Sequence, residues 1–186
     1  MINELSVKAK PSNNKARVAF YTALTVAALG AVTYLALRAL SVEKSGLVGF
    51  IPLAAAVAAV FFYSKYISGI YYYDVTFDSS GYAVFVVRQV IGKRNSTLCR
   101  IGISEIFRVQ RENTEQRRNH KTPKDHKRYS YLPTLLPEYS YRLITRSRYE
   151  RSEIIIECSD EFAELIKQYA AEAREADALR EAEDEY

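Results

Sequence analysis

Two apolar stretches near the N-terminus constrain this chain more than any other feature of its sequence. Residues 18–37 are twenty residues without a charge, and residues 47–63 are a second apolar run. At about 1.5 Å of rise per residue, twenty helical residues cross the roughly 30 Å hydrocarbon core of a bilayer. The second run extends to residue 70 if Lys65 carries its ammonium toward the headgroups. Because the connection between them is short, the sequence predicts an antiparallel transmembrane hairpin over residues 18–70.

Charges beside these stretches predict the side on which the rest of the chain lies. Lys and Arg are enriched on the cytoplasmic side of membrane spans. Residues 1–17 and the chain beyond residue 70 are rich in both, whereas the connector, residues 38–46, holds only Arg38 and Lys44. We therefore expect a cell (inner) membrane protein with two spans and with both termini in the cytoplasm. A cleaved signal peptide is disfavoured because a second apolar run follows the first.

Aromatic side chains gather where the second stretch ends. Tyrosine favours the membrane interface, where the ring is apolar and the hydroxyl is hydrated. The predicted interface anchors are Tyr63, Lys65, Tyr66, Tyr71, Tyr72 and Tyr73. Small residues recur at four-residue spacing, as at Ala27 and Ala31, which fits packing of the hairpin on itself or on a second copy. Neither stretch holds an acidic residue or a histidine, so no ion pathway is indicated.

The remaining chain is long enough for one further domain with its own core. Alternating apolar residues between turn signals predict six to seven strands, followed by a helix that Ser159 caps. The predicted domain covers residues 71–173, and residues 174–186 form an acidic extension. Residues 111–128 contain almost no apolar side chain and are predicted to be a long loop. The fold class is therefore a membrane α-helical hairpin plus an α+β domain.

The order of these elements resembles a known family, the small bacterial membrane proteins in which two transmembrane helices precede a pleckstrin-homology-like (PH-like) domain. The residues that carry the resemblance are Tyr71-Tyr72-Tyr73 leading into Val75-Thr76-Phe77, the turn Ser80-Gly81, the segment from Cys99 to Ile106, and the segment from Asp160 to Leu165. The resemblance implies an antiparallel β-barrel or sandwich closed by the C-terminal helix, and a scaffold for protein or lipid contacts. Eukaryotic relatives hold a lipid headgroup with Lys and Arg around the first hairpin loop. Here that loop, residues 78–81, lacks both, so no phosphoinositide site is expected.

The strongest local feature is a basic stretch with a net charge of +5 over residues 108–128. Near a membrane, each basic residue that reaches anionic lipid gains on the order of 1 kcal/mol. The alternatives are a solvated loop, or a site for an acidic protein or nucleic acid, the last disfavoured because no aromatic side chains are interleaved. The candidate lipid- or partner-binding residues are Arg108, Arg111, Arg117, Arg118, Lys121, Lys124, Lys127 and Arg128.

Groups that would support catalysis or metal binding are few. The sequence has no phosphate-binding glycine loop, hydrolase elbow or zinc-protease motif, so we expect a non-enzyme without a cofactor or metal. His120 and His126 lie in the predicted loop without a nearby cysteine. Cys99 and Cys158 are expected to be reduced thiols, because cytoplasmic proteins rarely hold disulfides. Residues 159–186 carry a net charge of −7, which either solubilises the tail or binds the basic stretch.

Two functions follow from these expectations. The first is a membrane-anchored, non-enzymatic PH-like module that mediates protein or inner-leaflet lipid interactions. Its partners would be membrane lipids and either another protein or a second copy of the chain. The alternative is a structural subunit that assembles with another integral membrane protein through the hairpin.

Overall fold

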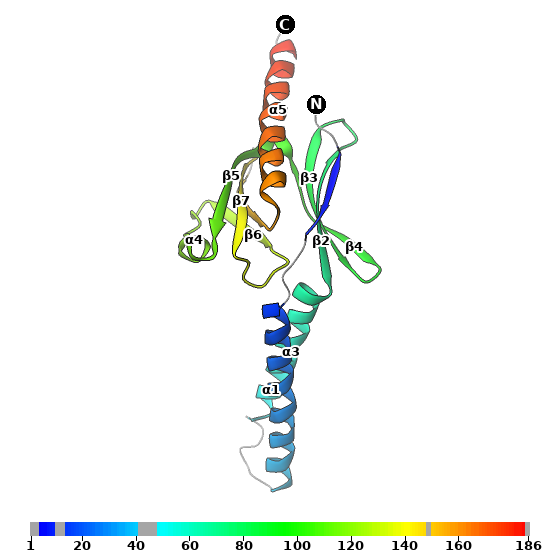
Figure 1. Ribbon diagram of the computed structural model, residues 1–186, viewed down its shortest axis with the longest axis vertical. Helices are drawn as coiled ribbons and strands as arrows, with labels where there is room; N and C mark the ends of the chain where they lie inside the picture. Colours follow the sequence, from blue (N-terminus) through cyan, green and yellow to red (C-terminus); the bar gives the residue numbers. More distant parts are fainter. Residues whose placement is uncertain (1–3, 10–13, 41–47, 148–149, 185–186) are drawn as a thin grey trace. The chain divides into compact units, whose positions relative to one another are not determined.

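The computed structural model describes residues 4–9, 14–40, 48–147 and 150–184 (Figure 1). The chain divides into two compact units. One, within Ser12–Gly69, holds the two apolar helices, and the other holds the described residues of Met1–Pro11 and Ile70–Tyr186. Residues 41–47 of the predicted connector and residues 185–186 of the predicted acidic extension lie outside the described residues.

The first unit contains the two predicted apolar helices. The helices are α1 (Asn14–Ala39) and α3 (Phe50–Phe62), which continues into one π-helical turn, η1 (Tyr63–Ile67). Both are long and apolar enough to cross a membrane, judged by length and composition. Their valines and leucines are largely exposed, for example Leu29 at 64% and Val32 at 65%.

Close packing joins the two helices. A Cβ atom added to Gly30 would lie 3.2 Å from Cδ of Pro52, so glycine lets the helices approach at this point. The rings of Phe20 and Tyr63 pack with their centroids 5.7 Å apart. Apolar helices in an apolar solvent gain no hydrophobic free energy by associating. They associate through close packing of this kind instead.

The second unit begins with a four-stranded sheet. Its strands, in spatial order, are β1 (Leu5–Lys8), β2 (Gly69–Phe77), β3 (Ala83–Ile91) and β4 (Arg94–Gly102). β1 pairs antiparallel with β2, and Leu5 lies opposite Val75. The sequence predicts only a cytoplasmic segment over residues 1–17, so this strand was not predicted. Four residues are too few for a period-2 pattern to be distinguished, and their pairing partner lies some seventy residues away.

A second sheet follows the short turn η2 (Ile103–Glu105). Its strands, in spatial order, are β5 (Ile106–Asn113), β7 (Tyr139–Arg146), β8 (Arg151–Ile156) and β6 (His126–Tyr131). β7 pairs antiparallel with β5 and β8, whereas β6 runs parallel to β8. Among the described strands no pairing joins the two sheets, so the α+β class is confirmed but a closed barrel is not observed.

The predicted long loop of residues 111–128 is wrong for most of its length. It contains the end of β5, a helix α4 (Thr114–Asn119) and the start of β6. Because β7 and β8 lie between β5 and β6 in the sheet, residues 114–125, here called the crossover, must pass over a face of these two strands. The loop was predicted wrongly because polar side chains, not apolar ones, hold the crossover on the sheet.

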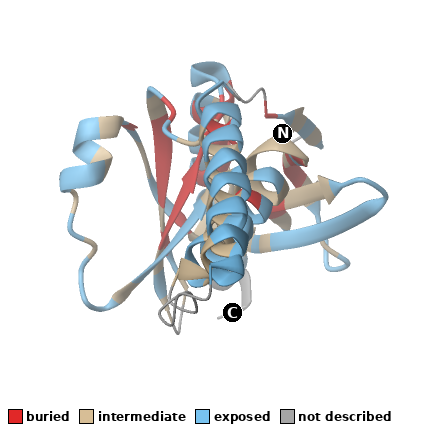
Figure 2. Ribbon diagram, turned by 90° about the horizontal axis from the view of Figure 1, so that it is seen from below, coloured by how far each residue is buried: buried red, intermediate tan, exposed pale blue. Residues whose placement is uncertain are grey.

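One hydrophobic core is shared by both sheets and the C-terminal helix α5 (Asp160–Asp184). As predicted, Ser159 caps this helix, since its Oγ accepts from the backbone N–H of Phe162 at 3.3 Å. The apolar face of α5 is buried through Phe162, Ile166 and Ala170. Figure 2 shows the buried residues concentrated on the strands, whereas the apolar helices are mostly exposed. The predicted extension from residue 174 continues α5 as helix.

Candidate functional site

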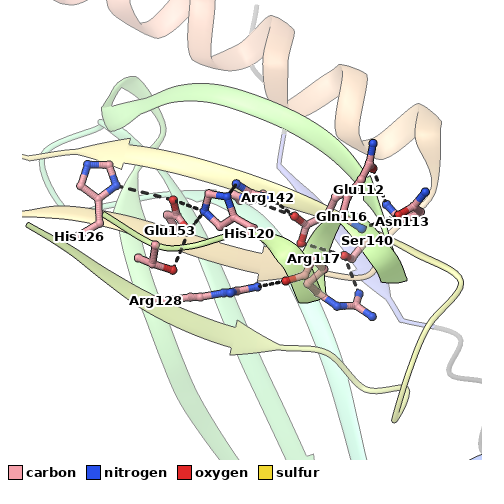
Figure 3. A network of polar contacts seen from close by, with 11 residues as sticks. Glu112, Asn113, Gln116, Arg117, His120, His126, Arg128, Ser140, Arg142 and Glu153 are labelled. Carbon is pink, nitrogen blue, oxygen red and sulfur yellow. Dashed lines mark hydrogen bonds and ion pairs between the residues drawn. The ribbon is translucent and has the colours of Figure 1, made fainter. Parts of the chain in front are cut away.

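The crossover and the strands beneath it share a network of polar side chains, here called the polar network (Figure 3). Alternation along β7 directs Tyr141 and Leu143 to the core and leaves Ser140 and Arg142 on the opposite face. The residues of the network are Glu112, Arg117, His120, Ser140, Arg142 and Glu153. Three of them, Glu112, Arg142 and Glu153, are charged residues with at most 8% exposure.

Arg142 is the centre of the polar network. Its guanidinium forms an ion pair with Glu112 and donates from Nη1 to Nδ1 of His120 at 2.8 Å. A guanidinium can only donate, so Nδ1 of His120 must accept and is unprotonated. The proton of the neutral ring therefore lies on Nε2, which is 3.0 Å from both carboxylate oxygens of Glu153.

Glu153 connects the crossover to β8. Besides His120, its carboxylate accepts from Oγ1 of Thr122 at 3.4 Å. Nδ1 of His126 lies 3.8 Å from Oε1 of Glu153 and is a buried atom without a hydrogen-bond partner. The predicted loop therefore holds both histidines in fixed places, which sequence reasoning did not foresee.

The polar network has a structural role, because it connects the crossover to the strands of the second sheet. Among the described residues no group of three or more His, Cys, Asp or Glu side chains is arranged to hold a metal ion. The hydrogen bond from Arg142 also keeps the proton of His120 on Nε2, the nitrogen that faces Glu153, so this nitrogen has no lone pair for a metal. A cavity of about 380 Å³ opens beside the network, lined by residues including Arg111, Gln116 and Arg142. No Ser, Cys or Lys nucleophile is among its lining residues.

Most of the predicted basic residues are engaged within the domain. Arg111 pairs with Asp160 at 3.2 Å, and its guanidinium lies 4.4 Å from the centroid of the Tyr139 ring. Lys127 pairs with Glu150 at 3.0 Å. These contacts direct the two cations toward the protein.

Arg117 has a structural role. It donates to Oγ of Ser140 at 2.8 Å and to the carbonyl of Pro137 at 3.3 Å. Burial lowers the pKa of its guanidinium. Arg128 in turn donates to the carbonyl of Arg117 at 3.4 Å. Arg108 lies against the side-chain amide of Gln110, at 3.0 Å when the amide oxygen faces the guanidinium.

Three of the eight candidates remain exposed and without a hydrogen bond or ion pair to any described residue. They are Arg118, Lys121 and Lys124, all on the crossover. These three cations have no partner among the described residues, whereas Arg111 and Lys127 are paired although their side chains are 55% and 65% exposed.

The predicted membrane anchors fall into two groups. Tyr71 and Tyr73 are 3% and 0% exposed in the core of the domain, so their rings are unavailable to headgroups, and Tyr72 is half-buried beneath Arg88. Alternation along β2 was the signal for this burial, since residues 71, 73 and 75 share one face. The others, Tyr63, Lys65 and Tyr66, belong to the turn that ends α3, where the Lys65 ammonium lies 5.3 Å from the Tyr66 ring centroid.

Comparison with known proteins identifies no relative. No protein-family model, curated protein or solved structure matches the chain.

Proposed function

We propose that this protein is a membrane-anchored, non-enzymatic interaction module. Two transmembrane helices hold the two-sheet domain at the inner face of the cell membrane, where the domain contacts a protein or the lipid headgroups. Both chain termini lie on the cytoplasmic side.

The observation that carries this proposal is the place of the apolar helices within the chain. They are inserted between β1 and β2, which are adjacent and pair residue by residue from Leu5 opposite Val75 to Lys8 opposite Tyr72. A chain that leaves one strand, crosses a bilayer and returns to pair with that strand must cross an even number of times. The two helices of sufficient length and apolarity supply the two crossings.

The domain is proposed to be PH-like. Support comes from a run of antiparallel strands followed by a second sheet, and from a C-terminal helix whose apolar face packs on the shared core. Scaffolds of this kind hold partners on surfaces and need no catalytic groups. The polar network agrees with this assignment, since its members satisfy one another.

The proposed contact surface is the exposed face of the crossover with Arg118, Lys121 and Lys124. Exposed cations close to an anionic leaflet gain binding energy without a defined pocket. An acidic protein surface offers the same attraction. The alternative subunit that assembles through the hairpin remains a prediction, because lipid explains the exposed apolar faces of α1 and α3 equally well.

Membrane insertion is tested by paired charge substitutions in the full chain. Leu29→Arg with Val32→Arg places two cations on exposed positions of α1, each costing about 2.5–3.5 kcal/mol near the centre of a span. The matched control is Phe107→Arg with Leu179→Arg, at positions of similar exposure, 66% and 64%, in the other unit. Only the α1 variant should lose alkali-resistant association with membranes. Equal extraction of both variants would overturn the proposal.

The contact surface is tested by hydrogen exchange of the full chain in lipid nanodiscs. Anionic lipid should slow exchange across residues 114–125 relative to zwitterionic lipid, and Arg118→Ser, Lys121→Ser and Lys124→Ser together should abolish the difference. The control replaces three exposed cations elsewhere, Arg100, Lys167 and Arg180, and should keep it. If lipid charge changes nothing in the wild-type chain, the crossover does not contact the leaflet.

A further inference from the structure

Both chain segments that lead to the apolar helices leave the domain at one end, here called the entry end. β1 ends at Lys8 and β2 begins at Gly69, and the N–H of Ala9 donates to the carbonyl of Tyr71 at 2.9 Å. Since β1 and β2 are antiparallel, the end of one lies beside the start of the other. The entry end is therefore the part of the domain with the shortest covalent path to the proposed spans.

The loop between β6 and β7, residues 132–138, lies at this same end. The hydroxyl of Tyr73 donates to the carbonyl of Tyr131 at 2.9 Å and accepts from the N–H of Glu157 at 3.2 Å. The carboxylate of Glu157 then accepts from the N–H and the hydroxyl of Thr134, at 3.1 and 2.8 Å. Tyr73 is the fourth residue after Gly69, the first residue of β2. Its hydroxyl thus connects the first half of β2 to this loop.

The loop is held rigidly on both sides. Glu157 fixes Thr134 on one side, and on the other the carbonyl of Pro137 accepts from Oγ1 of Thr114 at 2.6 Å and from Arg117. Pro137 and Thr134 are buried. The exposed residues of the loop are Leu136, which is 54% exposed, and Glu138, and Leu136 is the apolar one.

Leu136 also has an unusual backbone. Its φ is 140°, a conformation that L side chains rarely adopt and glycine adopts easily. Among the described residues it is the only non-glycine residue with a positive φ. A strained position that carries an exposed leucine, where glycine would relieve the strain, points to a use for the side chain.

A second tip projects at the entry end. β3 returns from the turn at residues 78–82 to Ile91, beside the start of β2, and a tight turn at Gly92, with φ 59°, leads into β4. Ile91 is 39% exposed, and Lys93 and Arg94 beside it are exposed cations. Figure 1 shows this hairpin tip and the β6–β7 loop at the same end of the domain.

We propose that these two tips dock into the lipid interface of the membrane, with Leu136 and Ile91 entering the boundary between headgroups and acyl chains. Lys93 and Arg94 then lie at the headgroups, where basic residues beside apolar ones strengthen binding to anionic lipid. Lipid is the occupant because the exposed side chains combine apolar tips with cations at the entry end. This inference rests on the proposed membrane anchor.

The test uses tryptophan as a depth probe in the full chain, which contains no tryptophan of its own. Leu136→Trp is compared with Phe107→Trp, an exposed position at the start of β5, at the opposite end of the domain. Both proteins are reconstituted in vesicles that contain brominated lipids. Quenching of Leu136→Trp should exceed that of Phe107→Trp by at least about twofold, with emission shifted to shorter wavelength, as for a side chain at the acyl boundary.

Three outcomes separate this inference from the proposed function. Equal, weak quenching at both positions, in protein that stays with the vesicles in alkaline carbonate, overturns the docking but keeps the anchor. Protein released by carbonate overturns the anchor itself. Emission that is blue-shifted without quenching shows that Leu136→Trp is covered by protein, which also overturns the docking.

A further pair of variants tests the cations. Lys93→Ser with Arg94→Ser should reduce the quenching of Leu136→Trp in anionic vesicles and leave it unchanged in zwitterionic ones. Lys167→Ser with Arg180→Ser removes the same charge from exposed positions on α5, outside both the tips and the crossover, and should leave the quenching unchanged. If the α5 variant reduces it equally, net charge alone acts and the two tips have no specific place at the interface.

Discussion

At the scale of single residues, Arg142 illustrates how a buried charge is tolerated. Its side chain is 10% exposed, and the guanidinium contacts Glu112 and His120. Removing one partner of a buried ion pair leaves the other charge uncompensated, which typically costs about 3–5 kcal/mol. We therefore expect Arg142→Met to lower the free energy of unfolding by this amount, measured by urea denaturation of the full chain in detergent micelles.

An exposed arginine provides the control for this substitution. Arg118→Met removes the same charge and adds the same side chain at a position without an ion pair, so its effect should stay within about 0.5 kcal/mol. Similar losses in both variants would show that the polar network does not stabilise the domain.

A buried thiol makes the domain sensitive to alkali. Burial raises the pKa of Cys158 to about 12. An unfolded thiol ionises near pH 8.5, so the unfolded chain releases a proton that the folded chain retains. The stability due to the neutral thiol is present below about pH 8.5 and is lost as the pH rises toward the folded pKa, by about 2–3 kcal/mol at about pH 10.5.

This loss is measured by urea unfolding at about pH 8 and about pH 10.5. Cys158→Ala should show a smaller decrease between the two conditions than the wild-type chain. Tyr131, whose pKa burial raises to about 12, contributes to the slope in both proteins and does not affect the difference. Equal decreases would mean that the thiol is accessible to hydroxide in the folded state.

At the scale of elements, the crossover depends on a local cap. The side chain of Asn113 accepts from the N–H of Gln116 at 2.7 Å, and the Gln116 side chain accepts from the N–H of Asn113 at 2.9 Å. This reciprocal capping box starts α4, a helix of six residues that is too short to form alone. The cap and the polar network together hold the crossover on the sheet.

Removing the cap should loosen this one element. Asn113→Ala is expected to cost about 1 kcal/mol and to speed hydrogen exchange of residues 114–119, because the backbone N–H of Gln116 loses its acceptor. Asn119→Ala, at the last position of α4, provides the matched control and should leave the exchange rates unchanged. Faster exchange throughout the domain would indicate that Asn113 acts on the whole fold instead of on α4.

Prediction from sequence succeeded for the helices and strands that bury one face in the core. Period-2 alternation located strands such as the one at residues 139–145, and three- and four-residue spacing located α5, because one face of each is buried in an apolar core. The crossover escaped because its partners are polar and distant, as for His120 and Glu153. Of the candidate site, the sequence identified the basic residue types but not that Arg117 is engaged internally.

At the scale of the whole molecule, the pairing of β1 with β2 makes a prediction about topology. The end of α1 and the domain should lie on opposite sides of the membrane, because each span reverses the side. In a chain with Cys99→Ser and Cys158→Ala, Leu40→Cys should react with a membrane-impermeant maleimide in intact cells. Phe107→Cys should react only after lysis, and labelling of both in intact cells would contradict two spans with a cytoplasmic domain.

The sequence by itself determined the apolar helices, the α+β class of the domain and the capped C-terminal helix. These depend on local periodicity and composition, which act over a few residues. Only the tertiary structure decided that β1 joins the sheet, that Tyr71 and Tyr73 belong to the core, and that most cations of the basic stretch are engaged. Each of these depends on a partner distant in the chain, and the free energy of such contacts is set by burial and geometry that appear only when the chain has folded.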